Sequence, residues 1–204
     1  MTGTELITLL ESFVDDELDQ DTALALLNNA KDKLESERDW SFLKTSSSSS
    51  ATTAAITLPS NYSRTIAIYV GTTPYLQIPF EQQRLFVGSG GHWYLDLASN
   101  ALYLTGSNLS GTMYHYYIKK TDDLTTSTEP VWPSRFHKLL AFDAAELYYA
   151  VDGGDRGRSW DDKFALQREL IRRSMVDWDV RLQARAYENQ LPDAMDYEVP
   201  LSLM

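Results

Sequence analysis

The chain has 204 residues, of which 43% are hydrophobic and 12% aromatic, and this composition excludes wholesale disorder. The absence of cysteine excludes disulfides, thiolate metal sites and a cysteine nucleophile. The formal charge of −11 makes the chain a poor candidate for binding a nucleic-acid backbone, because phosphate contacts need lysine and arginine.

The acidic excess is concentrated at the two ends of the chain. Residues 1–40 contain eleven acids and three bases, residues 191–204 contain three acids and no base, and the residues between them balance. Such a surface could line a path along which DNA slides without sticking, although charge alone does not establish that role. No apolar run approaches the roughly 20 residues that a membrane-spanning helix needs.

The first 40 residues predict two helices. Thr2 and Glu5 have the spacing of a capping box, and a leucine-rich stripe follows at steps of three and four residues. Asp21 is a suitable N-cap for the second helix. The acidic stretch DDELDQD between the helices fails as a calcium-binding EF-hand loop, because the positions that require glycine and glutamate hold Gln20 and Leu26.

The segment 45–55, TSSSSSATTAA, is polar and of low complexity, and it predicts a flexible linker or an exposed loop. Strand-like segments rich in tyrosine, isoleucine and threonine follow it, separated by turn residues. These segments are 65–70, 74–80, 92–97, 101–106 and 112–120. Alternation in YLDLASNALYL indicates a sheet face that is solvated or covered by another subunit, and its Ser-Asn pair predicts a tight hairpin.

Helical periodicity returns at Pro133, which suits the first position of a helix, and Trp132 is expected to staple the helix start. Alanines on this helix form a small flank where another helix can approach closely. The glycine pair 153–154 is expected to end the helix, and a second helix of roughly 28 residues, or about 42 Å, is predicted from Ser159 to about Tyr187. Because that length exceeds what a compact domain needs, part of the helix is expected to pack against a neighbour.

The search for chemistry yields no catalytic, cofactor-binding or metal-binding residue. Phosphate-binding loops, nucleophile elbows and His-Glu-x-x-His motifs are absent from the sequence. His92, His115 and His137 lie in different local settings, which disfavours a zinc site, and His137 is expected to contact the preceding loop or a partner. Asp143 lies near the apolar stripe of its helix, so a structural ion pair is expected there. Its candidate partners are Arg168, Arg172 and Arg173.

The last stretch, LPDAMDYEVPLSLM (191–204), cannot continue the helix past Pro192. Its spaced hydrophobic residues would lie in water if the stretch hung free, and such segments often dock on a partner. The alternative is a frayed terminus. The residues expected to dock on a partner are Leu191, Pro192, Tyr197, Val199, Pro200, Leu201 and Leu203.

Three sequence motifs (the phrases compared below) follow one another along the chain. Trp40 comes after the first helices, TLPSNY at 57–62 opens the β region, and PSRFHKLLAFDAAELY at 133–148 opens the next helix. In order and spacing, these phrases resemble those of the head–tail connector, or adaptor, proteins of tailed bacteriophages, over most of residues 25–190. The resemblance implies a ring of typically twelve copies beneath the portal, which joins the DNA-filled head to the tail and continues the DNA channel.

We therefore expect an α+β fold. It is a helical bundle, built from N-terminal helices and two C-terminal helices of which the last is long, with an inserted antiparallel β module and an extended C-terminal tail. The expected parts are an N-terminal helical segment (1–44), an inserted β-rich module (45–131), a C-terminal helical hairpin (132–190) and the tail (191–204). Subunit packing is expected at Phe136, Ala141, Ala144, Ala145, Trp160 and Trp178.

The resemblance implies a structural virion protein at the head–tail junction, made in the host cytoplasm, and neither an enzyme nor a cofactor-binding protein. Its expected partners are copies of itself in a ring, the portal protein, and tail or nozzle proteins. DNA is expected to pass through without sequence-specific binding, and no membrane partner is expected. The alternatives are a tail-completion or tail-terminator protein and, less favoured, a glycan-active enzyme. Such an enzyme needs a carboxylate pair, and Asp96 and Glu81 are the acids that the predicted strands offer, with their pairing left open.

Overall fold

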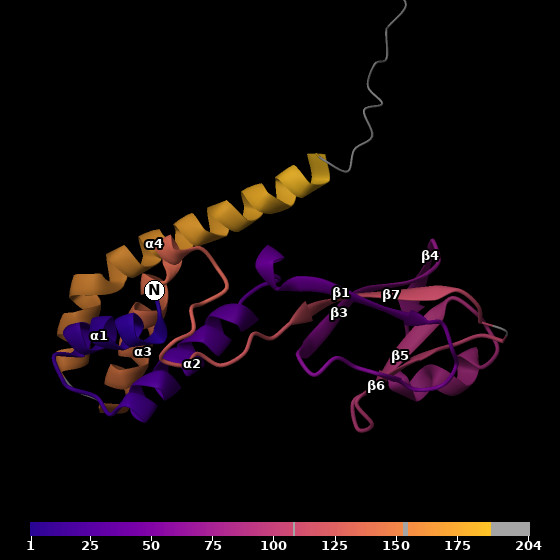
Figure 1. The fold of residues 1–204 in the computed structure, drawn as a ribbon, viewed down its shortest axis with the longest axis horizontal. Helices are drawn as coiled ribbons and strands as arrows, with labels where there is room; N and C mark the ends of the chain where they lie inside the picture. The colour runs from indigo at the N-terminus through magenta and orange to yellow at the C-terminus, as the bar shows by residue number, and fades with distance from the viewer. Residues whose placement is uncertain (108, 153–154, 189–204) are drawn as a thin grey trace, which may run out of the picture. The chain divides into compact units, whose positions relative to one another are not determined.

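The computed structural model describes residues 1–107, 109–152 and 155–188, and the chain divides into two compact units. The first, called the helical unit, combines Met1–Lys33 with the chain from Leu124 onward, and the second, called the β unit, is Leu34–Asp123. Figure 1 labels the elements of both units. A β region is thus inserted between helical segments, which confirms the predicted mixed α+β fold class.

The helical elements lie before and after the β region in the sequence. They are α1 (Gly3–Val14), α2 (Gln20–Ser36), the 3-10 turn η3 (Ser134–Phe136), α3 (Lys138–Asp152) and α4 (Asp155–Glu188). Helix α3 packs against both α1 and α4. Helix α4 has 34 residues and is therefore about 51 Å long. The glycine pair 153–154, expected to end a helix, lies outside the described residues, between α3 and α4. Among the described residues, none of the helices combines the length and the apolar composition of a membrane span.

The start of α1 confirms the predicted capping box. The Thr2 hydroxyl accepts a hydrogen bond from the Glu5 backbone N–H at 3.4 Å, and the Thr2 backbone N–H donates to the Glu5 carboxylate at 2.9 Å. The Gly3 backbone N–H donates to the Thr128 carbonyl at 2.9 Å. A Cβ atom at position 3 would lie 2.0 Å from the Thr125 carbonyl oxygen, so only glycine allows this approach. The first turn of α1 is therefore fixed to the segment that precedes α3.

The core of the helical unit lies where α3 meets its neighbours. The buried apolar side chains there include Leu6, Leu10, Leu139, Leu140 and Met175. The rings of Phe13 and Phe142 stack with centroids 4.6 Å apart, and Phe164 of α4 lies 5.3 Å from Phe13. Each buried side chain of this size contributes roughly 1.5–3 kcal/mol, so this apolar seam is the main source of stability for the bundle.

Two predicted helix starts were wrong. The side chain of Asp19, and not of Asp21, accepts the Thr22 backbone N–H at 3.3 Å, because α2 begins at Gln20. Helix α4 begins four residues before the predicted Ser159. Both errors arise because acidic residues crowd each start, so several positions satisfy the capping pattern.

The β unit contains a curled sheet. Its strands are β1 (Lys44–Ser50), β2 (Ile56–Thr57), β3 (Tyr62–Val70), β4 (Thr73–Gln77), β5 (His92–Asp96), β6 (Ala101–Leu104) and β7 (Thr112–Lys119), with 3-10 turns η1 (Ser41–Leu43) and η2 (Phe80–Phe86). Within the described residues the strand order is β1-β7-β3-β4-β5-β6-β2. Neighbouring strands are antiparallel except β4 and β5, which are parallel.

The prediction of a linker at 45–55 was wrong for its first half. Residues 44–50 form β1 and pair with β7 along their full length, from Lys44 opposite Ile118 to Ser50 opposite Thr112. Serine has little preference for strands, so this strand owes its existence to the backbone hydrogen bonds that β7 supplies. The serine-rich composition of residues 46–50 therefore gives no indication of strand β1.

The inner face of the curled sheet carries the core of the β unit. That core consists of Ala51, Leu58, Ile68, Trp93, Leu102, Leu104 and Met113. The Trp93 indole N–H donates to the Tyr75 carbonyl at 3.2 Å, which satisfies the polar atom of the largest core side chain. The predicted tight hairpin between β5 and β6 is present, and Asn100 adopts the left-handed conformation there, with φ 49°.

Candidate assembly surfaces

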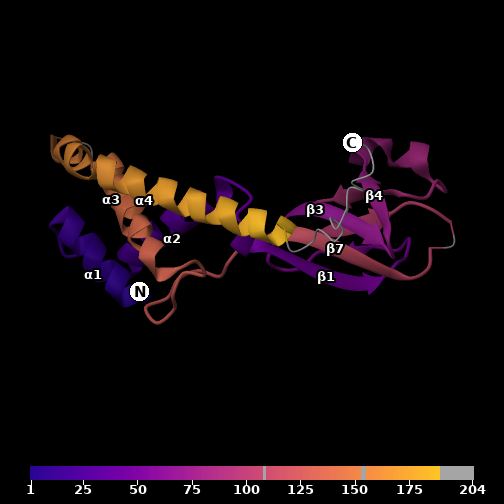
Figure 2. The same cartoon turned by 90° about the horizontal axis from the view of Figure 1, so that it is seen from above.

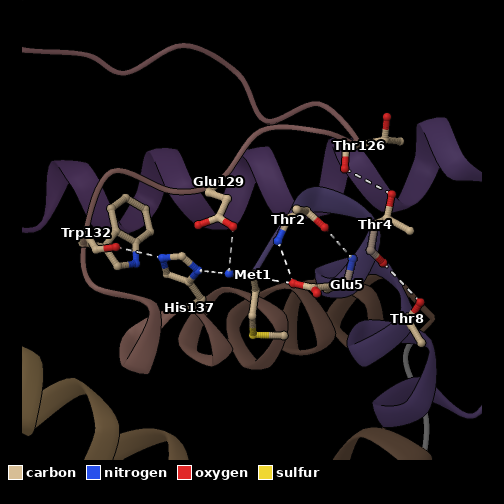
Figure 3. A network of polar contacts seen from close by, with 9 residues as sticks. All are labelled: Met1, Thr2, Thr4, Glu5, Thr8, Thr126, Glu129, Trp132 and His137. Carbon is tan, nitrogen blue, oxygen red and sulfur yellow. Dashed lines mark hydrogen bonds and ion pairs between the residues drawn. The ribbon is translucent and has the colours of Figure 1, made fainter.

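His137 lies inside the helical unit and contacts its own chain. Its Nε2–H donates to the Trp132 carbonyl at 2.8 Å, and its Nδ1 accepts from the Met1 α-ammonium group at 2.9 Å (Figure 3). Because Nε2 faces a carbonyl and Nδ1 faces an ammonium group, the ring is neutral and protonated only on Nε2. The expected contact with the preceding loop is confirmed.

Charged groups around the ammonium group complete this network. Glu129 and Glu5 lie 3.6 and 3.9 Å from the Met1 nitrogen. Burial lowers the pKa of His137 below its usual value, and the nearby ammonium group adds to that effect. The prediction that Pro133 is the first residue of a helix was also wrong, because Pro133 is the N-cap residue of η3 and α3 begins at Lys138. The hydrogen bonds of His137 therefore connect Met1 to the segment that leads into α3.

A second polar cluster joins α3 to α4. Both carboxylate oxygens of Asp143 accept hydrogen bonds from the Arg172 guanidinium, at 2.8 and 2.9 Å, which confirms the predicted ion pair. Burial raises the pKa of Asp143 to about 6 against the opposing effect of Arg172. Beside it, Glu146 contacts Arg168 at 2.8 Å and Lys33 of α2 at 3.3 Å. Burial opposes ionisation of Glu146, but these two cations hold its pKa below the usual value.

The residues predicted for subunit packing fall into three groups. Phe136, Ala141, Ala144 and Ala145 are buried within their own chain, where the alanine flank lets neighbouring helices approach closely. We therefore place these four side chains in the core of one chain. Trp178 is half-buried, with its ring 5.6 Å from that of Phe136. The side chain of Trp160 and the whole tail, 191–204, lie outside the described residues.

Helix α4 exposes apolar side chains that the sequence analysis did not identify. Leu166, Leu170 and Val180 are 73, 57 and 50% exposed. Their spacings of four and ten residues place all three within one side of the helix. The opposite side, at Met175, is fully buried against the bundle. Arg173 and Asp177 lie on the same side as these three residues, so α4 presents separate apolar side chains among charged ones opposite its buried side.

The β unit also exposes aromatic side chains on the outer face of its sheet. Tyr114 and Tyr116 of β7 and Tyr69 of β3 are each about 40% exposed, and we call these three residues the tyrosine face. The rings of Tyr69 and Tyr116 meet edge to face at 5.9 Å. Over β5 and β6, in contrast, η2 covers the outer face, since Phe80 and Phe86 contact Tyr94 and His92.

The glycan-enzyme alternative gains no support from the geometry. Asp96 accepts hydrogen bonds from the Ser99 hydroxyl at 2.7 Å and from the Ala98 backbone N–H at 3.0 Å. The bond from Ser99 lowers the pKa of Asp96, whereas a general acid needs a raised value. Glu81 is exposed on η2. A hollow beside β5 and β6 has no carboxylate among its described lining residues.

The other two histidines make hydrogen bonds within the β unit. His115 is buried and hydrogen-bonded through Nε2 to the Thr65 hydroxyl at 3.0 Å, and burial lowers its pKa to about 4. His92 bonds the Gly90 carbonyl at 3.1 Å. In the described part of the chain, no three histidine or carboxylate side chains gather as a metal-ligand cluster.

Comparison with known proteins identifies the family. The sequence matches the family model described as SU10 adaptor protein over residues 1–191, which is most of the chain. No curated protein matches the sequence. The match agrees with the resemblance carried by Trp40, 57–62 and 133–148, all of which lie inside the matched range. The chain therefore belongs to the SU10 adaptor protein family, a family of structural head–tail adaptor proteins of bacteriophages.

Proposed function

We propose that this protein forms the adaptor ring beneath the portal, joins the DNA-filled head to the tail and continues the DNA channel. The observation that carries the proposal is the match to the SU10 adaptor protein family over residues 1–191. The proposed ring has twelve copies and contacts the portal on one side and tail or nozzle proteins on the other. The protein is made in the host cytoplasm and becomes part of the virion.

The two exposed surfaces support ring formation. A closed ring uses heterologous contacts, so each copy must offer two different faces to its neighbours. The outer side of α4 and the tyrosine face are two such faces, made by different units and different kinds of side chain. We propose that Leu166, Leu170 and Val180 of α4 take part in packing between subunits, together with the predicted Trp160 and Trp178 of the same helix.

The charge of the chain suits a protein that surrounds DNA without holding it. The net charge is −11, and residues 1–40 carry most of the excess. Like charges repel, so a channel lined by carboxylates keeps phosphates from adhering. We propose that DNA passes through the ring without sequence-specific binding.

We propose that the tail attaches the subunit to another chain of the assembly, either the portal or a neighbouring copy. The family match ends at residue 191, at the point where the tail begins. The tail has no basic residue, and its hydrophobic side chains recur along an extended sequence. The proposed docking residues are Leu191, Pro192, Tyr197, Val199, Pro200, Leu201 and Leu203.

Mass photometry of the purified chain with and without the portal protein tests the proposal. The expected result is a portal-bound species whose added mass is twelve times that of the chain. Binding to the tail-tube protein in place of the portal would instead support a tail-completion protein. Failure to bind the portal would reject the adaptor role.

A matched pair of variants on α4 tests the proposed packing surface. Leu170→Glu should reduce ring formation on the portal by at least tenfold, because it places a charge on the exposed apolar side. Gln167→Glu adds the same charge at an exposed position on the margin of this surface, about 60° around the helix from Leu170, 100° from Leu166 and 140° from Val180, and should reduce ring formation much less. Equal loss in both variants would point to charge repulsion and remove α4 from the interface.

A further inference from the structure

Strand β1 forms an open edge of the sheet. It pairs with β7 on one side, and within the described residues no strand pairs with its other side (Figure 2). Natural edge strands are usually protected from further pairing by charged residues, proline or bulges. Residues 46–50 are all serine and pair with β7 in continuous register, so β1 has none of these protections beyond Lys44 at its start.

The hydrogen-bond pattern shows which residues of β1 face outward. The Ala51 backbone N–H donates to the Gly111 carbonyl at 2.9 Å, immediately beyond the β1–β7 ladder and in the same register. Because bonding direction alternates along an antiparallel strand, residues an odd number of positions away present their N–H and C=O to the free edge. These residues are Ser46, Ser48 and Ser50, with Lys44 before them.

The same residues border the tyrosine face. Cross-strand neighbours share a sheet face, and Ser46 and Ser48 lie opposite Tyr116 and Tyr114. The serine side chains are short, so they leave the tyrosine rings accessible from the free edge. A strand added beside β1 would therefore place those of its side chains that pair with Ser46 and Ser48 next to Tyr114 and Tyr116.

The tail has the pattern of such a strand. Across residues 197–203, YEVPLSL, apolar residues occupy every second position: Tyr197, Val199, Leu201 and Leu203. Pro200 has no N–H, so it fits an added strand only where its nitrogen faces away from β1. The residues that then bond to β1 are the four apolar ones, whose side chains fall on the tyrosine face. The orientation that Pro200 requires is thus the same one that buries the four apolar side chains against the tyrosine face.

We propose that residues 197–203 of one copy pair as an additional β-strand with β1 of a second copy and cover the tyrosine face. The inference rests on the proposed assembly, because a second copy supplies the strand. Tail and edge are different surfaces, so their pairing is heterologous and can continue around a ring. Residues 189–196 lie between α4 and the pairing segment and can span up to about 27 Å when extended.

Disulfide trapping tests the pairing, and the chain has no cysteine that would interfere. Val199→Cys is combined in turn with Ser46→Cys, Ser48→Cys and Ser50→Cys, because paired residues lie within disulfide range. Val199→Cys with Thr57→Cys on β2, at the other end of the strand order, is the control. Oxidation of the full chain, with and without the portal protein, should give a covalent ladder of oligomers for a β1 pair and none for the control.

The outcomes separate this inference from the proposed function. A ladder without portal binding supports the strand pairing and rejects the adaptor role. Portal binding with no ladder for any β1 pair, or with only intramolecular disulfides, overturns the pairing and leaves the adaptor role standing. Absence of both rejects both.

A matched pair of tail variants tests which face of the segment is buried. Leu201→Glu should weaken self-association at least tenfold, because it places a carboxylate on the tyrosine face. Ser202→Glu adds the same charge on the opposite face and should change self-association by less than twofold. Both can be measured by sedimentation of the full chain. Equal effects of the two variants would overturn the proposed orientation.

Discussion

The helical unit and the β unit use their polar and apolar side chains in different ways. In the helical unit, the buried carboxylate of Asp143 is held by Arg172, and His137 is held by a carbonyl and an ammonium group. The β unit holds a compact inner core, but leaves tyrosines and an open strand edge on its outside. The difference indicates that the bundle is fastened by charged contacts between its helices, whereas the β unit relies on its apolar core and leaves a backbone edge without a paired strand among the described residues.

The largest expected effect tests whether the two units are stabilised separately. Trp93→Ala removes the largest side chain of the β-unit core and should destabilise that unit by about 3–5 kcal/mol. Hydrogen exchange followed by mass spectrometry should show lost protection in β3, β5, β6 and β7, with protection of α1 and α3 retained. Equal loss in α1 and α3 would show that the units unfold together.

Asp143→Ala tests the polar stabilisation of the helical unit. Removing one partner of a buried ion pair leaves Arg172 without its carboxylate, so a loss of about 3 kcal/mol in the free energy of unfolding is expected. Urea denaturation measures it. The control Arg173→Ala removes an exposed pair with Glu169 and should cost less than about 0.5 kcal/mol. Similar losses for both variants would contradict a special role for the buried pair.

His115 should make the β unit sensitive to acid. Its pKa is about 4 in the folded chain against an ordinary value of 6.5, so its contribution to stability is fully present above pH 6.5 and is lost as pH falls toward 4. Between pH 7 and 4.5, the wild type should lose about 2 kcal/mol more than His115→Gln does. Urea denaturation of both proteins at each pH measures the difference, and identical pH profiles would contradict the prediction.

The smallest expected effect concerns the start of α1. Thr2→Ala removes the capping hydroxyl and should cost about 1 kcal/mol. Thr8→Ala, at an exposed position on the same helix, should change stability by less than about 0.5 kcal/mol. Thermal unfolding of the two variants compares them, and a larger loss for the Thr8 variant would sink the capping argument.

Features set by nearby residues could be predicted from the sequence. The Thr2–Glu5 capping box and the turn at Asn100 depend on neighbours within a few positions, and both were found. The pair between Asp143 and an arginine was also predicted, because a carboxylate beside an apolar stripe needs a cation. Its partner could be narrowed to three candidates but not to Arg172, since the choice depends on how α3 and α4 pack.

Features set by distant parts of the chain could not be predicted. β1 exists because β7 pairs with it, and serine composition gives no sign of that partner. The contact of His137 with the Met1 ammonium group joins residues 136 positions apart. The open edge and the tyrosine face appear only once strand order and register are known, because alternation alone does not tell which face a neighbouring element covers.

The chain is held together where it leaves and re-enters the helical unit. The Asn28 amide exchanges hydrogen bonds with both backbone groups of Leu124, at 2.7 and 3.2 Å. In the β unit, the Glu35 carboxylate accepts from the Thr121 backbone N–H at 3.3 Å and from its hydroxyl. Hydrogen bonds thus join the segment that leaves the helical unit, at α2, to the segment that returns to it, at residues 121–124. Because the two ends of the β unit meet at these contacts, a change in the length of the β unit does not alter the path of the helices.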